Sequence, residues 1–498
     1  MNRSRIIVLS VVAVIMLAAV VVVLRADRMA EDMAAKYIRQ AADGQHIELS
    51  WSDLHIRLLH GSVRMDSLRV QFALPDSSAQ HDTTYLSLTL PRVDIGRIHW
   101  LTLLKHRLVH IDGAQLTNGA LLLSKHNNHT TLVLDSLNLA AHDLCYNLID
   151  STFSYNDSVY HLHLSNLDFT SADGLFRATV GDLATTDAGS IVMRNIAGGN
   201  TDNKEQHAFK IGKHEATWAQ FRLSEVRTSP VNIIRLALAK QVHVDTVVVQ
   251  GQQVEIYYDA QFPPKAPHPM PQQTLAAMPM PLNVGCVTAT LPKMHVGVCL
   301  DGKNAGALDL NGTQARITNI CNKQGSTMHV QLATHIGGGD VKVTTDLTLD
   351  KQCSLTYNAD INNLKGSDLR SLTEPLVGVD LQCRFHSIST HCKGDGQQMQ
   401  GDFCMTYDSL KVNLDEHGPM KDLASMAWLI NPLASVVLFN RNPRFDNQQP
   451  DAFNVNVYYD PMQPFPAYYI FAVADGVLQT ILPFGMGKGM VGKKKQQK

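Results

Sequence analysis

The pattern of apolar and polar residues changes once, close to the start of the chain. Residues Ile6–Leu24 form an apolar run without a charge, and roughly 20 such residues cross the hydrocarbon core of a membrane as a helix. From Ile47 onward, apolar and polar residues alternate in short segments separated by turn residues, as in antiparallel strands. The pattern predicts a mainly β fold with short helices, in which a transmembrane helix (6–24) precedes a long antiparallel sheet.

Charges around the apolar run predict its orientation. Arg3 and Arg5 precede the run and mixed charges follow it, so residues 1–5 are expected to stay in the cytoplasm. A cleaved signal peptide is the alternative, but its apolar region is usually shorter and no A-x-A-like site follows Leu24. No second run of this length follows, so we expect a single-pass protein with most of its chain outside the cytoplasm.

Helical patterns flank the alternating region. Residues 25–44 have apolar residues at helical spacing and predict a juxtamembrane helix that Gly44 ends. In the segment 419–485, two apolar helical patterns, Asp422–Phe439 and Ala467–Leu482, are broken by Pro432 and Gly476 respectively. They are expected, together with a strand, to plug or cap the β structure. Residues 486–498 form a basic tail that is expected to be solvated.

Two stretches, Arg92–Leu123 and Arg222–Tyr258, match one another and are interpreted as two copies of one unit. Repeated units of this kind pack against their neighbours in an elongated array. Each copy is expected to run from a strand through a short helix (Leu101–Lys105; Val231–Lys240) into a strand that opens with Val-His-Ile-Asp or Val-His-Val-Asp (Val109–Asp112; Val242–Asp245).

A segment rich in Pro, Gln and Met, residues 261–282, lacks strand alternation. It predicts an extended, polyproline-like linker. This linker is expected to divide the body into an N-terminal repeat region, residues 45–260, and a C-terminal β-meander, residues 283–418.

Charge and cysteine spacing exclude several classes of function. The 43 Lys and Arg residues nearly balance the 45 Asp and Glu residues, so nothing points to nucleic acid. None of the eight cysteines forms a C-x-x-C pair, which argues against a zinc or thioredoxin-like site. The cysteines are interpreted as small buried hydrophobic residues, with cross-strand disulfides as the alternative.

The chain lacks the common catalytic motifs. It has no H-E-x-x-H, no G-x-S-x-G and no complete Walker loop. Its 22 histidines are scattered among strands, as in His161–Leu164, where the imidazoles are expected to face outward. We therefore predict a protein that is not an enzyme, with no catalytic, cofactor-binding or metal-binding residue.

One tripeptide recurs, with Asp followed by Ser or Thr and then by an apolar residue. The simplest interpretation is a turn whose last residue opens the next strand. The alternative is that the pattern is similar to the O-glycosylation acceptor sequence of exported Bacteroidota proteins. The tripeptide occurs at Asp66–Leu68, Asp135–Leu137, Asp157–Val159, Asp245–Val247 and Asp408–Leu410.

Together, the anchor, the repeated "VHID" and "VHVD" starts and the long meander resemble the AsmA-like family of envelope proteins, with a Bacteroidota member as the nearest expectation. The C-terminal part also resembles this family. There Gly401–Phe403 leads to Tyr407–Val412 and, after a helix, to Asn440–Pro443, as in a closing segment of the form G…Y-x-x-L-K-V…N-P.

The resemblance implies a sheet curled into an open groove with an apolar lining, held at the inner membrane and reaching through the periplasm. It also implies a role in moving phospholipid or another envelope lipid, in support of outer-membrane biogenesis, with outer-membrane assembly proteins as further partners. The residues that line the groove are not assigned. Two alternatives stay open: a periplasmic scaffold or regulator of outer-membrane protein assembly that transfers no lipid and, less favoured, an exported hydrolase.

Overall fold

The computed structural model describes most of the chain between residues 26 and 482. Two compact units divide it, residues 1–196 and residues 197–498, here called unit 1 and unit 2. Within this range the structure leaves out residues 37, 41–46, 76–82, 100–101, 103–104, 126–130, 148–151, 155–159, 232–240, 301, 304 and 415–437.

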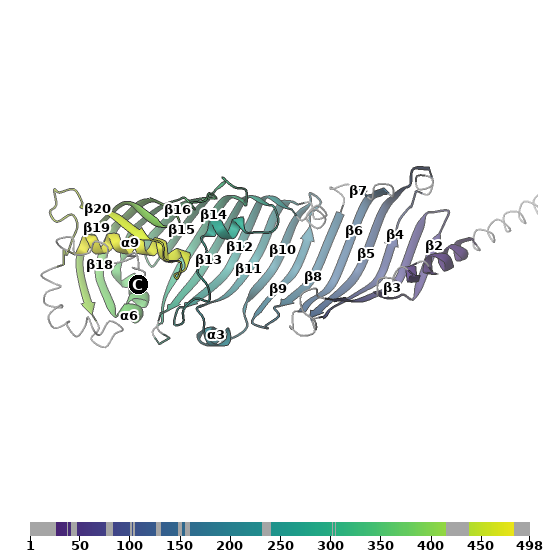
Figure 1. Cartoon of the computed structure of the whole chain (residues 1–498), viewed down its shortest axis with the longest axis horizontal. Helices are drawn as coiled ribbons and strands as arrows, with labels where there is room; N and C mark the ends of the chain where they lie inside the picture. The colour runs from purple at the N-terminus through teal and green to yellow at the C-terminus, as the bar shows by residue number, and fades with distance from the viewer. Residues whose placement is uncertain are drawn as a thin grey trace, which may run out of the picture. The chain divides into compact units, whose positions relative to one another are not determined.

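The described chain is mainly β, as the alternation predicted, and its long sheet is not closed. Strands in unit 1 follow one another as an antiparallel meander (Figure 1). Two short strands pair in succession with the same neighbour, β3. The strands that lie in or begin in this unit are β1 (Ile47–Ser50), β2 (Asp53–Arg57), β3 (Ser62–Pro75), β4 (Thr83–Ile95), β5 (Leu108–Lys125), β6 (Thr131–Asn147), β7 (Thr152–Ser154), β8 (Tyr160–Thr170), β9 (Phe176–Thr185) and β10 (Ser190–Asn200).

Unit 2 contains a second run of long strands, with short helices between some of them. Its helices are α3 (Lys204–Lys210), α5 (Pro271–Ala276), η1 (Gly366–Leu369), α6 (Arg370–Val377) and α9 (Phe465–Ile481). Its strands are β11 (Ala216–Pro230), β12 (Val242–Asp259), β13 (Leu282–Cys299), β14 (Ala305–Cys321), β15 (Thr327–Ile336), β16 (Gly339–Thr348), β17 (Leu355–Lys365), β18 (Val379–Gly394), β19 (Gln398–Leu414) and β20 (Ala452–Tyr458). Strands β13–β19 form the predicted antiparallel meander. Strand β20, which belongs to the segment 419–485, extends it by pairing with β19.

Residues 261–282 do not separate two domains. The strands on either side of this segment, β12 and β13, pair in parallel from Val242↔Leu282 to Asp259↔Cys299, and both belong to unit 2. Parallel neighbours cannot be joined by a tight turn, so the chain has to run back along the sheet before the next strand begins. The Pro-rich segment makes this return and includes α5.

A helix at residues 26–36, continued at 38–40, confirms part of the predicted juxtamembrane helix. In Figure 1 it is the purple helix beside β2. Glu31 accepts a hydrogen bond from the backbone N–H of Ile56 at 2.9 Å, and Asp27 accepts one from Leu58 at 3.0 Å. These N–H groups lie at an edge of the sheet, where unpaired backbone groups invite association with other chains.

The predicted membrane span, Ile6–Leu24, lies outside the described residues, as do Gly44, residues 422–437 of the helical pattern Asp422–Phe439, and the basic tail. In the part of the chain that the structure describes, no helix has both the length and the apolar character needed to cross a membrane.

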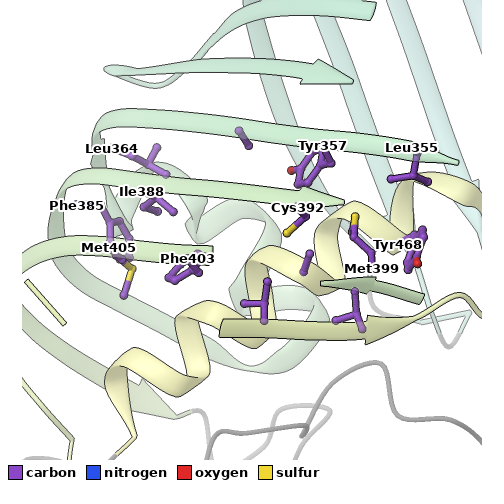
Figure 2. Packing of buried hydrophobic residues seen from close by; sticks show 14 of the residues in the cluster. Leu355, Tyr357, Leu364, Phe385, Ile388, Cys392, Met399, Phe403, Met405 and Tyr468 are labelled. Carbon is purple, nitrogen blue, oxygen red and sulfur yellow. The ribbon is translucent and has the colours of Figure 1, made fainter. Parts of the chain in front are cut away.

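The largest hydrophobic core lies in unit 2, where α9 packs on one face of the last strands. Figure 2 shows side chains of this cluster, among them Cys392, Met399 and Phe403, gathered where α9 runs along the sheet. Gly476 does not break the helix, contrary to the prediction. It lies inside α9, and an added Cβ would meet the Phe403 ring at 2.1 Å. The glycine therefore lets the helix approach the sheet closely.

The Asp-Ser/Thr-apolar tripeptides are not turns at the four described positions, so this interpretation was wrong. They lie within β3, β6, β12 and β19. Ser67 and Ser409 adopt positive φ angles, 53° and 58°, which short polar residues tolerate better than apolar ones. Hydrogen bonds from Ser409 and then from His386 lower the pKa of Asp408. Both serines are exposed, and their glycosylation stays a prediction; Asp157–Val159 lies outside the described residues.

Both repeat copies form the predicted second strand, but the two strands differ in how they pair with their neighbours. The Val-His-x-Asp motifs lie near the start of β5 and at the start of β12, as predicted. In the first copy, residues 102, 105 and 106 are helical, whereas residues 232–240 of the second copy lie outside the described part. β5 pairs with an antiparallel neighbour on each side, but β12 pairs in parallel with β13.

Candidate functional site

The strand register of unit 1 gathers apolar side chains on one face of the sheet. Because side chains alternate between the two faces of a strand, residues directly opposite each other on neighbouring strands share a face. Leu88 of β4 lies opposite Leu121 of β5, which lies opposite Leu134 of β6. Four rows of this kind run across the strands: Val70–Leu88–Leu121–Leu134–Leu167–Val180, Leu86–Leu123–Leu132–Phe169, Met65–Val93–Leu116–Leu139–Leu162 and Leu68–Leu90–Gly119–Leu137–Leu164–Leu183. Irregularities at residues with positive φ, such as Ser67 and Asn118, shift the alternation by one residue, so that the row of Met65 and the row of Leu68 share a face. We call this surface the leucine face.

The opposite face of the same strands is polar and carries ion pairs. Arg64 and Arg92 contact Asp94 at 2.8 and 2.5 Å, and Arg177 pairs with Asp168 across β8 and β9. Leu122 is an exception, since it lies on this face and is 45% exposed. The contrast between the two faces means that the leucine face is a property of the register and not of a generally apolar composition.

The leucine face is only half-buried. Of its residues, Leu90 and Leu134 are buried, each 5% exposed, and the other described side chains keep part of their surface accessible. Both buried hydrophobic clusters of the described chain lie in unit 2. No helix with described bounds packs on β5–β9. Among the elements with described bounds, none buries the leucine face as α9 buries the last strands of unit 2.

A pocket of about 640 Å³ lies between the helix at residues 26–36 and strands β2–β4, and side chains from both faces of β3 and β4 line it. Its apolar lining includes Val63 and Ile95, which lie opposite each other and continue the leucine face. Its polar lining carries both signs of charge, from Asp27, Arg28, Glu31, Arg57, Arg64 and Asp94. Such a pocket offers partners to a ligand with both an anionic and a cationic group.

The cysteines of unit 2 behave as packing residues where the structure buries them. All eight cysteines of the chain are described, and none forms a disulfide. Cys299, Cys353 and Cys392 are buried, and burial raises the pKa of the Cys383 thiol to about 12. The interpretation as small hydrophobic residues therefore holds for the buried thiols.

The sequence predicts no catalytic, cofactor-binding or metal-binding residue, and it assigns no residue to the lining of the groove. The outward direction predicted for His161 and His163 is confirmed, because both histidines are exposed. They alternate along β8 with Leu162 and Leu164, which belong to the leucine face. The alternation of apolar and polar residues was the signal in the sequence from which these leucines could have been identified. The sequence did not supply the register that aligns them into rows.

Comparison with protein-family models and with curated proteins gives no match.

Proposed function

We propose that the leucine face binds the acyl chains of phospholipid, and that the protein is an AsmA-like envelope protein that holds or conveys lipid between membranes. The observation that carries this proposal is the set of leucine rows that continues across β3–β9 without a described helix covering β5–β9. A protein core would normally bury such rows.

The energetics favour a long, flexible, apolar occupant. Burying one CH₂ group contributes about 0.8 kcal/mol. The binding free energy of an acyl chain therefore grows with the length of chain that contacts the face. Neighbouring strands lie about 4.8 Å apart, so a chain lying across the strands meets a new leucine at each step along a row. Leucine dominates these rows, and aliphatic side chains can shift to follow a mobile occupant.

The mixed-charge pocket suits a zwitterionic head group. Arg28, Arg57 and Arg64 can donate to a phosphate, while Asp27, Glu31 and Asp94 can accept from an ammonium group. Val63 and Ile95 lie in the same pocket. A phospholipid whose head group occupies the pocket can therefore place its acyl chains on the leucine face.

The AsmA-like resemblance supports an inner-membrane location with the body in the periplasm, and a role in outer-membrane biogenesis. The parts of the resembling C-terminal segment are in contact in unit 2. The backbone N–H of Asn442 donates to the carbonyl of Tyr407 at 3.0 Å, and the N–H of Leu410 donates to the carbonyl of Asn440 at 2.9 Å. The two parts of the segment therefore lie side by side in the fold.

Two double variants test the proposal. Leu88→Glu/Leu121→Glu places two carboxylates opposite each other on the leucine face, whereas Ser87→Glu/Leu122→Glu places the same pair on the polar face of the same strands. The full chain is produced in a bacterium with a two-membrane envelope, purified in mild detergent and analysed by native mass spectrometry and lipid extraction. Carboxylates are costly beside acyl chains, so we expect bound phospholipid to fall more than tenfold in the first variant and to stay unchanged in the second.

Either of two results would overturn the proposal. A wild-type protein that carries no phospholipid would favour the scaffold. Equal lipid on the two variants would move the binding site away from the leucine face.

A further inference from the structure

Five metal-ligating side chains meet where residues 97–99, β5 and β6 lie side by side in unit 1. His99 Nε2 lies 2.5 Å from Asp112 Oδ1, and His110 Nε2 lies 2.8 Å from Asp143 Oδ1. The rings of His99 and His110 stack with centroids 4.4 Å apart. Ligand atoms of His99, His110 and Asp112 lie within 4.8 Å of one another, and so do those of His110, Asp143 and Cys145. His110 belongs to both triads.

Strand geometry explains why these side chains converge. His110 and Asp112 are two residues apart on β5 and therefore share a face. On β6, Asp143, which has a φ of 54°, and Cys145 both bring their ligand atoms within 4.8 Å of His110. Cys145 lies directly opposite His110, and the N–H of His99 donates to the carbonyl of His110 at 2.9 Å.

Histidine–carboxylate pairs recur on this chain, so a single pair is no argument for a metal. His163–Asp182, His295–Asp309, His329–Asp346 and His386–Asp408 lie within 2.6 to 2.8 Å, and each pair bridges neighbouring strands. Among the described residues, only the His99–Cys145 region brings together three or more potential ligands. Two adjoining pairs and a thiol distinguish it.

The second repeat copy provides an internal comparison. Its motif carries His243 and Asp245, whose Nε2 and Oδ1 atoms are 3.7 Å apart. Opposite His243 lies Asn283 on β13, and the amide of Asn283 contacts His243 Nδ1 at 3.2 Å. The second copy therefore keeps the Val-His-x-Asp sequence but not the neighbouring ligands.

We propose that His99, His110 and Asp112, with Asp143 or Cys145, bind a divalent ion of the Zn²⁺ class. Imidazole, carboxylate and thiolate together suit this ion, whose ligand distances are about 2.0 Å to nitrogen or oxygen and about 2.3 Å to sulfur. Ligand atoms within 4.8 Å need shift only by about an ångström to reach such a sphere. Arg97 Nε lies 3.7 Å from Asp112 Oδ2, and a bound ion would replace this ion pair. The ion would tie the ends of three neighbouring segments together.

Tag-free full-length protein, stripped with a chelator, is titrated with Zn²⁺ in equilibrium dialysis and with Co²⁺ in absorption spectroscopy. We expect one tightly bound Zn²⁺ per chain, with a dissociation constant below about 1 μM. We expect His110→Ala to weaken binding at least 100-fold, because both triads lose their shared ligand, and His243→Ala to leave it unchanged. Near-ultraviolet Co²⁺–thiolate absorption that disappears in Cys145→Ser would place the thiol among the ligands; its absence would assign the fourth ligand to Asp143.

Circular dichroism checks that the variants fold. His99→Gln serves as a second variant that loses a ligand, because glutamine can still form a hydrogen bond with Asp112. The proposal fails if the wild type binds no stoichiometric Zn²⁺, or if His110→Ala and His99→Gln bind it as well as His243→Ala does. Neither outcome depends on whether the leucine face holds lipid.

Discussion

Strands β16–β20 of unit 2 and strands β4–β9 of unit 1 have the same alternating pattern but different surroundings. In unit 2, α9 covers the apolar face, and Met399, Phe403 and Met405 are 0% exposed. In unit 1, most of the corresponding rows remain half-buried, and among the described residues of the leucine face only Leu90, Gly119 and Leu134 are buried. Alternation thus defines which side chains share a face, and a separate element decides whether that face becomes a core.

The two faces also differ in the kinds of side chain that they carry. The covered face contains aromatic residues in fixed contacts, such as Tyr357 and Tyr469, whose rings stack 4.1 Å apart, and Tyr469 also shares a 2.6 Å hydrogen bond with Thr345. The leucine face consists mainly of aliphatic residues without such partners. Fixed contacts specify one packing, whereas an aliphatic surface suits an occupant that slides.

The strongest test of this comparison removes one large side chain from each face. Phe403→Ala is expected to cost about 3–5 kcal/mol of unfolding free energy, because it opens a cavity beneath α9. Leu121→Ala is expected to cost about 1 kcal/mol, because its side chain is only half-buried. Hydrogen exchange of peptides from β19 and β5 at increasing urea concentrations measures the two losses separately. Equal costs would mean that the leucine face is itself a packed core.

Much of the fold could be predicted from the sequence, because short-range patterns carry it. Alternation predicted the strands, and helical spacing predicted the helix at residues 26–36 and the position of α9. The parallel pairing of β12 with β13 could not be predicted, because a Pro-rich segment looks the same whether it separates domains or returns along a sheet. Gly476 was read as a helix breaker, since its contact with Phe403 depends on packing between residues more than 70 positions apart.

The candidate sites were harder to predict than the strands. The common ligand motifs H-E-x-x-H and C-x-x-C have the spacings of helices and turns, whereas His110–Asp112 and Asp143–Cys145 have the two-residue spacing of a strand. Such spacings are common in any alternating sequence. They become informative only when the register places Cys145 opposite His110.

A second, smaller effect concerns thiol reactivity in the covered region. Burial raises the pKa of Cys383 from 9.0 to about 12, so at pH 9 roughly one molecule in 1,000 carries the reactive thiolate. We expect iodoacetamide at pH 9 to leave Cys383 unlabelled while it labels the half-exposed Cys321, as peptide mass spectrometry would show. Since the folded-state pKa is raised, the contribution of this thiol to stability is full below pH 9 and is lost as the pH rises toward 12. Equal labelling in the folded protein would mean that this part of the sheet is not covered.

The smallest effect concerns the edge of the uncovered sheet. Asp27 and Glu31 are one helical turn apart and accept the N–H groups of Leu58 and Ile56, so each carboxylate substitutes for a missing strand partner. Replacing either with Ala is expected to cost about 1 kcal/mol and to speed amide exchange at residues 56 and 58. Asp32→Ala, on the exposed side of the same helix, is the matched control. If the helix covers this edge to keep it from pairing with other chains, Asp27→Ala/Glu31→Ala should also raise the tendency to aggregate, measured by light scattering, while Asp32→Ala should not. Unchanged exchange at Ile56 and Leu58 would show that the edge is protected by something other than these two carboxylates.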